Sequence, residues 1–372
     1  MKKILFAANL DSFFIKFLIP YLKFFKDKNY EIHIAAKEDG SNIPYYDKKF
    51  NINFARSLNF KQNIESYKQM KDLLKKEHYD IIFCHTPFGA AITRLAAKKY
   101  RKTGTKVIYI AHGFHFFKGA PLFNWLTFYP AEKYLSKFTD ILLTINEEDY
   151  NRANKKFKKC NVKYMPGIGL DVSKFGFSMT NEEKQELRNS LNLKEDDFVG
   201  IYAAEILPRK RQEWLIRSLE KTIKENNKIH ILLPGRDSMN GKCHELVKSL
   251  GLENNIHLIG LRKDIPRLLK TVDFATSSSK QEGLPVNIME AMYVGLPIVA
   301  CDCRGVGDLV VNNKNGYLIP LDDSKMFAEK IENLYKGLGL KDAKKIDEEI
   351  ISDFLIDNAV NKFYEICKEY ID

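Results

Sequence analysis

The sequence predicts an α/β protein made of two doubly wound parallel sheets, and three observations lead there. At 372 residues the chain is too long for one ordinary core and suits two domains of similar size. Short apolar runs alternate with helical patterns in both halves, as they do in βαβ units. A glycine- and proline-rich stretch at Met165–Asp171 separates the two series and indicates a hinge. Ligands are therefore expected in a cleft between the domains, at the carboxyl ends of the strands.

Each series of apolar runs predicts five strands. Those of the first half are expected at Ile4–Ala8, Glu31–Ala36, Ile81–Cys84, Val107–Ala111 and Ile141–Ile145, with helices that include Ile64–Lys76 and Ala90–Lys99. Those of the second half are expected at Val199–Ala203, Ile229–Leu233, Ile256–Ile259, Val272–Thr276 and Ile298–Ala300. The segment Phe354–Tyr370 has the period of a final helix. Because the first apolar run stops at Asn9, it predicts a strand rather than a signal peptide.

Charge is unevenly distributed along the chain. Residues 1–175 carry 31 Lys and Arg against 16 Asp and Glu, whereas the remainder carries 28 against 32. Such an asymmetry suggests that the first half faces an anionic surface, either nucleic acid or anionic lipid. No run of about eighteen apolar residues is long enough to span a bilayer. The six cysteines have no metal-binding spacing, which favours reduced thiols.

The most informative stretch is Gln281–Pro297, which sets two carboxylates, Glu282 and Glu290, across a predicted loop-to-helix junction. Pro285 suits the first turn of the helix, and Gly295-Leu296-Pro297 suits its end. The free N–H groups at the start of a helix bind anions, and the two carboxylates accept hydrogen bonds on either side. A nucleotide sugar has this form, with a diphosphate between two hydroxylated rings. A glutamate near a helix start can instead be only a favourable dipole partner.

The pattern Glu-Gly-Leu-Pro, Glu-Ala-Met and Gly-Leu-Pro-Ile-Val-Ala within residues 282–300 resembles the signature of retaining glycosyltransferases of the GT-B fold, the large group usually numbered family 4. The resemblance implies two Rossmann-like domains facing across a cleft. The first would be an acceptor domain, residues 1–168 completed by a C-terminal helix at 354–372, and the second a donor domain at 169–353. It also implies that Glu290 accepts hydrogen bonds from the ribose and that Glu282 holds hydroxyls of the donor sugar. The backbone lining the sugar and phosphate would be that of Gly283, Leu284, Pro285 and Val286.

A basic triplet, Arg209-Lys210-Arg211, follows a predicted strand and precedes a helix, where it could neutralise a diphosphate leaving group. A solvated basic turn is the alternative. By the resemblance Lys210 matches the family's lysine, but Glu205 stands where the family has an arginine. Whether Arg209 or Arg211 supplies the second positive charge is left open. Two further loops match those that lie around the nucleotide, and they contain Gly235 and Leu261.

Histidines at the predicted strand ends are the remaining candidates. His112 follows the strand Val107–Ala111 and precedes Gly113, and the resemblance implies that it contacts the donor sugar at the reaction centre. On its own a histidine here is as readily a structural hydrogen bonder. His115 is a weaker candidate, and His85 is expected to be structural or to line the cleft. No Asp-X-Asp occurs, so we expect a metal-independent enzyme without a cofactor, using a UDP-sugar as co-substrate.

Aromatic and lysine-rich segments of the first half predict association with lipid. The helix at Phe13–Lys28 is either a core helix or an interfacial one, and the segment from Phe114 to Tyr129 adds aromatics. The first half also resembles bacterial transferases that extend undecaprenyl-diphosphate-linked sugars for capsule or exopolysaccharide. This resemblance implies a lipid-linked saccharide acceptor and a cytoplasmic protein held peripherally at the inner face of the plasma membrane.

Three alternatives were considered beside this function. A UDP-sugar 2-epimerase of the same fold would bind the same donor but has no use for a basic, lipid-facing half. A non-catalytic GT-B subunit could bind carbohydrate or act as a scaffold, although the Glu282 and Glu290 pair argues against loss of donor binding. Nucleic-acid binding is suggested by charge alone, and no recognised motif supports it, so no nucleic-acid partner is expected.

Overall fold

The structure is a computed structural model that describes residues 1–55, 57–338, 340 and 343–371. It divides into two compact units. Unit 1 comprises Met1–Gly169 together with Ile356–Asp372, and unit 2 comprises Leu170–Leu355. The chain thus passes from one unit to the other twice, at residues 169–170 and 355–356. Within unit 2 these two connections run side by side, because Leu170 N–H donates to the Phe354 carbonyl at 2.7 Å.

Unit 1 is built on a parallel sheet which, in the described part of the chain, has seven strands in the order β3-β2-β1-β4-β5-β6-β7. The strands are β1 (Lys3–Leu10), β2 (Glu31–Lys37), β3 (Lys48–Asn51), β4 (Ile81–His85), β5 (Lys106–Ala111), β6 (Ile141–Thr144) and β7 (Asn161–Tyr164). The central strands are mainly apolar because helices cover both of their faces, as parallel sheets require.

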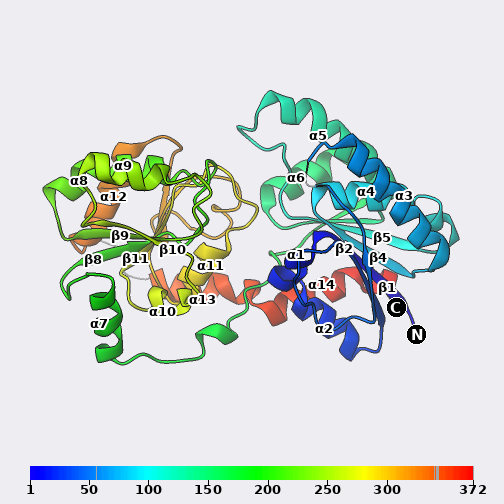
Figure 1. The fold of residues 1–372 in the computed structure, drawn as a ribbon, viewed down its shortest axis with the longest axis horizontal. Coiled ribbons are helices and arrows are strands. Elements are labelled where there is room, and N and C mark those ends of the chain that lie inside the picture. The colour runs from blue at the N-terminus through cyan, green and yellow to red at the C-terminus, as the bar shows by residue number, and fades with distance from the viewer. Residues whose placement is uncertain (56, 339, 341–342, 372) are drawn as a thin grey trace. The chain divides into compact units, whose positions relative to one another are not determined.

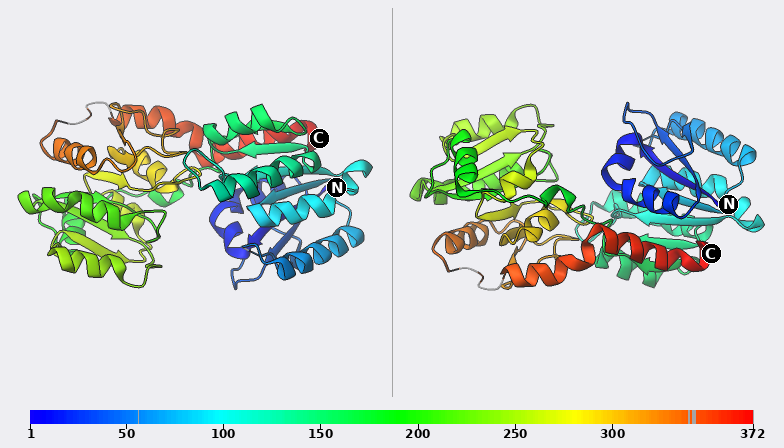
Figure 2. Two further views of the ribbon diagram at one scale, coloured as in Figure 1. Left: turned by 90° about the horizontal axis from the view of Figure 1, so that it is seen from above. Right: turned by 90° about the horizontal axis from the view of Figure 1, so that it is seen from below.

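Helices lie on both faces of the unit 1 sheet (Figure 1). One face carries α3 (Phe60–Lys76), α4 (Pro87–Ala97), α5 (Leu122–Leu135) and α6 (Glu147–Lys156), and the other carries α1 (Asp11–Phe17), α2 (Ile19–Asp27) and α14 (Ile356–Ile371). The last helix is part of the core, since the Phe363 ring packs on those of Tyr21 and Phe83. The N- and C-termini lie close together in both views of Figure 2, where the Lys2 ammonium contacts the Ile371 carbonyl.

Unit 2 has a second parallel sheet of six strands among the described residues, in the order β10-β9-β8-β11-β12-β13. Its strands are β8 (Phe198–Ile201), β9 (Ile229–Pro234), β10 (Ile256–Gly260), β11 (Phe274–Ser277), β12 (Ile298–Cys301) and β13 (Gly316–Ile319). Its helices are α7 (Asn181–Ser190), α8 (Gln212–Glu225), α9 (Lys242–Leu250), α10 (Ile265–Leu269), α11 (Val286–Tyr293), α12 (Ser324–Tyr335) and α13 (Ala343–Ile351). Figure 1 shows α8, α9 and α12 on one face of the sheet and α10, α11 and α13 on the other.

These two sheets confirm the predicted α/β class with two doubly wound parallel sheets. All ten predicted strands are present, within one or two residues of their predicted limits at most ends. Three four-residue strands were not predicted, namely β3, β7 and β13. Each lies at the edge of its sheet, where one neighbour is missing and partial exposure admits residues such as Lys48, Lys49 and Lys163. Such strands lack the continuous apolar run that marks a central strand.

Each sheet has a point at which the strand order reverses direction, and ligands of doubly wound proteins bind at such points. In unit 1 it lies between β1 and β4, and in unit 2 between β8 and β11. Loops that follow these strands leave from the same edge of the sheet because the strands are parallel. In unit 2 the two loops contain Lys210 and Glu282, and in unit 1 they follow Leu10 and His85.

Candidate functional site

The candidate site of unit 2 is centred on the Glu282 carboxylate, in the loop between β11 and α11 where the sequence predicted it. Glu282 is 7% exposed, so its charge requires partners inside the fold. Lys210, from the loop after β8, places its ammonium nitrogen 2.5 Å from Oε1, and the Ser279 hydroxyl donates to the same oxygen at 2.5 Å. The second oxygen, Oε2, has the Arg209 guanidinium at 3.4 Å. The structure thus brings the adjacent residues Arg209 and Lys210 to Glu282, from which they are 73 and 72 residues away in sequence.

The three basic residues of the triplet have different surroundings. Lys210 is 9% exposed and faces Glu282, and the Arg209 side chain is 46% exposed beside it. Arg211, in contrast, forms an ion pair with Asp322 and lies over the Trp214 ring at 4.7 Å. Its φ of +60° ends the turn before α8 and directs the side chain away from Glu282. Of the two arginines left open by the sequence, Arg209 is the one beside Lys210.

Hydrogen bonds from neighbouring side chains fix both loops. The buried Tyr202 hydroxyl bonds with Ser279 Oγ at 2.7 Å, and Ser278 Oγ donates to the Lys210 carbonyl at 2.8 Å. On the other side the Arg304 guanidinium donates to the Glu282 carbonyl at 2.9 Å from the loop after β12. These residues were not predicted. A serine run after a strand and an arginine among glycines are the signals that could have indicated them.

The predicted turn Gly283–Val286 leads into α11, with Pro285 as the N-cap and Val286 as the first helical residue. Pro285 therefore stands one position before the first turn in which it was predicted. Gly283 is in close backbone contact, since a Cβ on Gly305 would come within 2.2 Å of the Gly283 carbonyl oxygen. Leu284 is 9% exposed. The first N–H groups of α11 have no acceptor within the helix and face the end of this turn.

Glu290 lies in the second turn of α11 and is 8% exposed. Its carboxylate forms an ion pair with Lys174, which belongs to the short 3-10 helix Ser173–Phe175 of the same unit. Sequence reasoning missed Lys174 because 116 residues separate the two side chains. A ribose bound by Glu290 would have to share that carboxylate with the half-exposed Lys174 ammonium.

The remaining predicted residues of unit 2 line the same edge of the sheet. Gly235, at the end of β9, lies against the β8 loop so closely that a Cβ would come within 1.9 Å of the Ala204 carbonyl oxygen. Leu261, after β10, is 69% exposed. Glu205, which stands where the family has an arginine, is exposed and accepts a hydrogen bond from Ser238 at 2.6 Å.

His112 lies in unit 1, at the end of β5, and is hydrogen-bonded to His85 at the end of β4. The distance from His85 Nδ1 to His112 Nε2 is 3.0 Å. The His112 ring also packs edge-on against Phe13, with the ring centroids 5.1 Å apart. Burial lowers the pKa of His112 to about 4 and that of His85 well below its usual range, so both rings are neutral near pH 7.

The proton positions of this pair follow from the surroundings of His85. Its Nε2 is buried and has no partner in the structure. A buried N–H without an acceptor is rarer in proteins than a buried acceptor without a donor, so Nε2 is assigned the lone pair. His85 then donates from Nδ1 to His112, and His112 carries its own proton on Nδ1. His115, the weaker candidate, instead stacks on Phe128 at 4.5 Å between centroids.

Thr86 follows His85 and adopts a strained backbone conformation that the sequence did not indicate. Its φ is +63°, which is unusual for a β-branched residue and is often found at functional sites. The Thr86 hydroxyl donates to Asn9 Oδ1 at 2.6 Å, and the Gly89 N–H donates to the same oxygen at 3.0 Å. Asn9 lies at the carboxyl end of β1, so this contact marks the reversal point of the unit 1 sheet.

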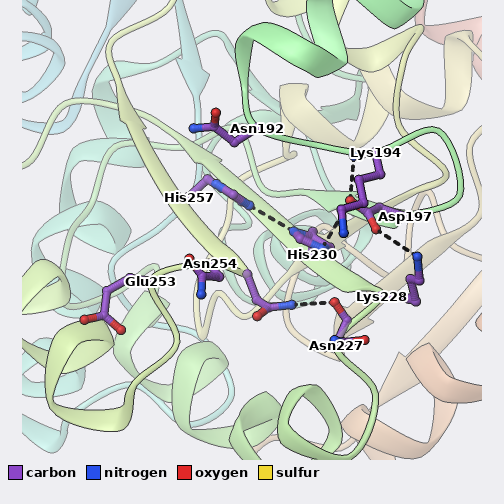
Figure 3. Close-up of a pocket in the computed structure, with 10 residues that line it drawn as sticks. Asn192, Lys194, Asp197, Asn227, Lys228, His230, Glu253, Asn254 and His257 are labelled. Carbon is purple, nitrogen blue, oxygen red and sulfur yellow. Dashed lines mark hydrogen bonds and ion pairs between the residues drawn. The ribbon is translucent and has the colours of Figure 1, made fainter.

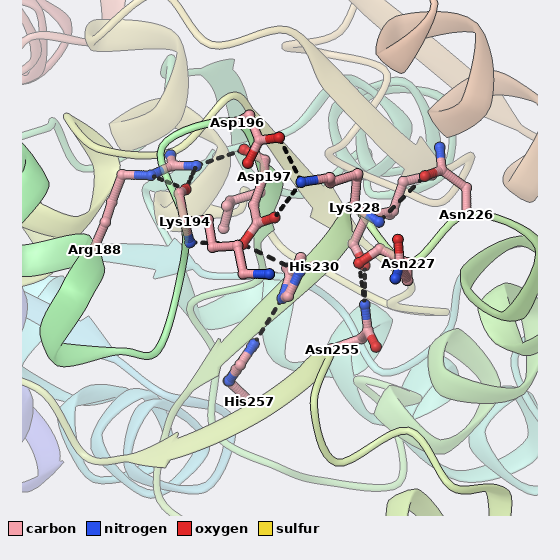
Figure 4. A network of polar contacts seen from close by, with 12 residues as sticks. Arg188, Lys194, Asp196, Asp197, Asn226, Asn227, Lys228, His230, Asn255 and His257 are labelled. Carbon is pink, nitrogen blue, oxygen red and sulfur yellow. Dashed lines mark hydrogen bonds and ion pairs between the residues drawn. The ribbon is translucent and has the colours of Figure 1, made fainter.

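A separate polar pocket of about 500 Å³ opens at the amino edge of the unit 2 sheet (Figure 3). It contains a chain of contacts in which Asp197 Oδ2 lies 3.4 Å from His230 Nε2, and His230 Nδ1 lies 3.1 Å from His257 Nε2. Figure 4 shows how Arg188 closes this edge by donating to the Lys194 carbonyl. None of the predicted site residues lines this pocket, which lies at the end of the strands opposite to Glu282.

Two features are absent from the described residues. No helix in that part of the chain has both the length and the apolar character needed to cross a membrane. No group of three or more His, Cys, Asp or Glu side chains in the same residues could hold a metal ion. The six cysteines are free thiols, and all but the partly exposed Cys160 are buried.

Comparisons with known proteins agree with this architecture. The family model Glycosyl transferases group 1 matches residues 183–352, and the model Glycosyl transferase 4-like matches residues 3–146. The chain is 40% identical to the protein EpsD of Bacillus subtilis (strain 168) over 335 residues, covering 90% of this chain and 87% of that protein. It is 27% identical over 363 residues to the Escherichia coli UDP-Gal:alpha-D-GlcNAc-diphosphoundecaprenol alpha-1,3-galactosyltransferase, covering 90% and 91% of the two chains.

The fold has a close structural counterpart. The crystal structure of Anabaena HepE in complex with UDP and glucose has a TM-score of 0.76 and 20% identity, and the match covers 99% of this chain and 100% of that chain. The two doubly wound sheets are those of the GT-B fold. Because a family model matches a segment of each unit, and because a relative is 40% identical over 90% of this chain, the chain belongs to the glycosyltransferases of group 1.

Proposed function

We propose that this glycosyltransferase moves a hexose or an N-acetylhexosamine from a UDP-sugar to a saccharide carried on undecaprenyl diphosphate, in the synthesis of a bacterial surface polysaccharide. The observation that carries the proposal is the buried cluster of Glu282, Lys210 and Arg209 at the reversal point of the unit 2 sheet. The donor class is supported by HepE, which was solved with UDP, and by the E. coli relative, whose name specifies UDP-Gal. That relative's name also specifies a diphosphoundecaprenol-linked acceptor.

When the donor binds, one part of the site would contact its sugar and another part its diphosphate. A lysine ammonium has three donor hydrogens, and Glu282 uses only one of those of Lys210, so the others can reach phosphate oxygens. Arg209 and the N-terminus of α11 would add positive charge on the same side. Oε2 of Glu282 has only the long Arg209 contact and keeps room for a sugar hydroxyl. Glu290 would accept from the ribose.

His112 would meet the donor sugar as a neutral side chain that donates from Nδ1. Its low pKa suits this role because it stays uncharged at the pH of the cytoplasm. We also propose that the product keeps the anomeric configuration of the donor. A product analysed by NMR immediately after transfer should contain the α-linkage from an α-linked UDP-sugar, and a β-linkage would contradict retention.

The leaving diphosphate would be neutralised by side chains rather than by a metal ion. Lys210 and Arg209 supply two positive charges where the leaving group develops its charge. Transfer should therefore proceed unchanged in excess EDTA. A loss of activity in EDTA that Mg²⁺ or Mn²⁺ restores would contradict this proposal. Because the acceptor is carried on lipid, we further propose that the protein works at the inner face of the plasma membrane.

The first experiment measures UDP released from UDP-GlcNAc, UDP-GalNAc, UDP-Gal and UDP-Glc in turn, with and without a bacterial membrane extract rich in lipid-linked sugars. Release from one donor only in the presence of extract is the expected result and identifies the sugar. Epimerised donor without extract would favour the 2-epimerase. UDP binding without release from any of the four donors would favour a non-catalytic subunit.

Two variants and a control assign the activity to this site. Glu282→Gln removes the charge that pairs with Lys210, and Lys210→Met removes its partner. Each should lower kcat/KM by at least about tenfold, because a hydrogen bond to a charged group contributes about 1.5–3 kcal/mol. Glu329→Gln, on the exposed side of α12 in the same unit, should leave activity unchanged. Equal rates in all four proteins would exclude the cluster from donor binding.

A further inference from the structure

Helix α5 of unit 1 has an apolar face that the fold leaves uncovered. Leu122, Phe123 and Leu126 are 72%, 59% and 68% exposed. At 100° per residue these three lie on one side of the helix, and the exposed Lys133 and Tyr134 continue that side toward its C-terminal end. The exposed Lys137 follows in the 3-10 turn Ser136–Phe138. A helix that is apolar on every side is normally buried on every side. We call this side, residues 122, 123, 126, 133, 134 and 137, the outer face of α5.

The opposite side of α5 is fixed to the core, so the outer face is a permanent surface. Trp125, Phe128 and Tyr129 pack against the core cluster of unit 1. The buried Glu132 carboxylate accepts from Arg94 of α4 at 2.8 Å and from the Tyr109 hydroxyl at 3.4 Å. Turning the apolar residues inward would break this buried ion pair, which is costly.

The exposed charges of residues 98–137, the segment that contains α5, are of one sign, whereas the first turn of the neighbouring α6 carries Glu147, Glu148 and Asp149. Between residues 98 and 137 the chain has eight Lys and Arg and one acidic residue, Glu132, which is buried against Arg94. Lys118, Lys133 and Lys137 are exposed. Lys155 and Lys156 of α6 are exposed as well, on the helix whose Arg152 lies over the Trp125 ring. Exposed leucine and phenylalanine surrounded by lysine are the side chains that bind an anionic lipid interface.

The segment Phe13–Lys28, for which the sequence left a core helix and an interfacial helix open, is mostly packed. It is two helices, α1 and α2, and its Phe14, Leu18, Leu22 and Phe25 are fully or almost fully buried. Phe24 packs on Tyr364 of α14. This segment is therefore largely core, the other of the two possibilities that the sequence left open.

We propose that the outer face of α5 docks on an anionic lipid bilayer, with Leu122, Phe123 and Leu126 in the interface and Lys133 and Lys137 at the headgroups. A bilayer is favoured over a protein partner because the exposed charges of residues 98–137 are all positive and match a surface of uniform negative charge. The inference deepens the proposed function, since it rests on an acceptor held in a membrane and identifies the element that reaches it.

The test is sedimentation of the purified chain with sucrose-loaded vesicles of phosphatidylethanolamine and phosphatidylglycerol, in the absence of any donor or acceptor. The triple variant Leu122→Ser, Phe123→Ser, Leu126→Ser should bind at least tenfold more weakly than the wild type. Lys133→Glu with Lys137→Glu should weaken binding to these vesicles at low salt and have little effect on vesicles of phosphatidylcholine. Unchanged melting temperatures would show that the variants are folded.

A matched control is available on α3. Phe60 and Ile64 are 78% and 56% exposed, but the neighbouring Glu65 and Asp72 are exposed too, so that surface has mixed charge. Phe60→Ser with Ile64→Ser should bind vesicles as the wild type does. Equal binding by the α5 triple variant would overturn the proposal. A wild-type dimer that the triple variant converts to monomer would also overturn it, by assigning the face to a second copy.

Vesicle binding is independent of the donor chemistry. If the triple variant loses vesicle binding but still hydrolyses or transfers the donor sugar to a water-soluble acceptor analogue, the docking face is established apart from catalysis. If wild-type protein binds vesicles but transfers no sugar from any donor, the proposed function fails while the docking face stands.

Discussion

At Glu290, the predicted role in donor binding can be tested separately from a role in stability. Its one partner given by the structure, Lys174, is 43% exposed at the side chain, so solvent can take over when the carboxylate is removed. Glu290→Ala should raise the Kd for UDP by about 10- to 100-fold, because the ribose loses an acceptor whose hydrogen bonds contribute about 1.5–3 kcal/mol. Calorimetric titration with UDP measures this. Lys174→Ala is the control, and unchanged UDP affinity in Glu290→Ala would refute the ribose role.

Asp347 of α13 makes a second prediction for a single residue. It is fully buried, Asn315 donates to its Oδ1 at 2.8 Å, and its Oδ2 has no partner in the structure. Burial raises its pKa from 3.8 to about 7. The folded state therefore holds a proton that the unfolded state has lost, and stability from this group falls as pH rises from about 4 to 7.

Asp347→Asn should remove that dependence, because the amide keeps the Oδ1 acceptor and carries no charge. At pH 8 the variant should be more stable than the wild type by on the order of a few kcal/mol. Urea unfolding at pH 5 and pH 8 measures the difference, with Asp353→Asn as an exposed control nearby. A variant that is less stable than the wild type at pH 8 would show that the ionised carboxylate is stabilised.

At the scale of elements, the loop after β12 is positioned by close backbone contact with the loop that contains Glu282. Gly305 has φ +78° and no room for a Cβ, which would lie 2.2 Å from the Gly283 carbonyl oxygen. Gly305→Ala should destabilise the protein by about 1–3 kcal/mol and weaken UDP binding by shifting Gly283. Gly307→Ala in the same loop should be neutral, since its nearest contact is 3.9 Å away. Thermal melts and UDP titrations of both variants measure the contrast.

The elements that the sequence predicted are those whose signal is local. Central strands such as β9 are recognised by their apolar runs. Because the loops after parallel strands leave from one edge of the sheet, the sequence could assign both Glu282 and Lys210 to one nucleotide site. Lys174 was missed because nothing beside it in the sequence indicates a contact made 116 residues away. The serine run and the arginine among glycines mark Ser279 and Arg304 as loop residues, but they do not specify that these side chains contact Glu282. The sequence left open whether Phe13–Lys28 is a core or an interfacial helix, because the apolar residues of α2 and α5 look alike until α14 covers α2.

For the whole molecule, acid stability should be governed by two buried histidine pairs, one in each unit. Burial lowers the pKa values of His112 and His257 to about 4, and lowers those of His85 and His230. His230 lies near the charges of Asp197, Arg188 and Lys228. Burial outweighs the attraction of Asp197, so the pKa of His230 is below its ordinary value. Between pH 6.5 and 4 the unfolded chain therefore binds more protons, and these groups make stability fall as pH drops.

In the Asp347→Asn background, the urea midpoint of unit 2 should be lower at pH 5 than at pH 7.5, and His257→Asn should reduce that difference. Tryptophan fluorescence of Trp214, in unit 2, and Trp125, in unit 1, can follow the units through single-tryptophan variants. A midpoint that is flat from pH 7.5 to 5 would contradict the predicted proton uptake on unfolding.

The location of α14 has a consequence for how the molecule is made. Its Phe363 fills the space between Tyr21, Phe25 and Phe83, yet it follows all of unit 2 in the sequence. The larger segment of unit 1 precedes unit 2 but cannot complete its core until all of unit 2 has been synthesised. During translation, unit 2 can finish folding first while the first 169 residues wait with an exposed aromatic surface. Chaperones would therefore meet the N-terminal part of the nascent chain, and a premature stop before residue 356 would leave that surface permanently open.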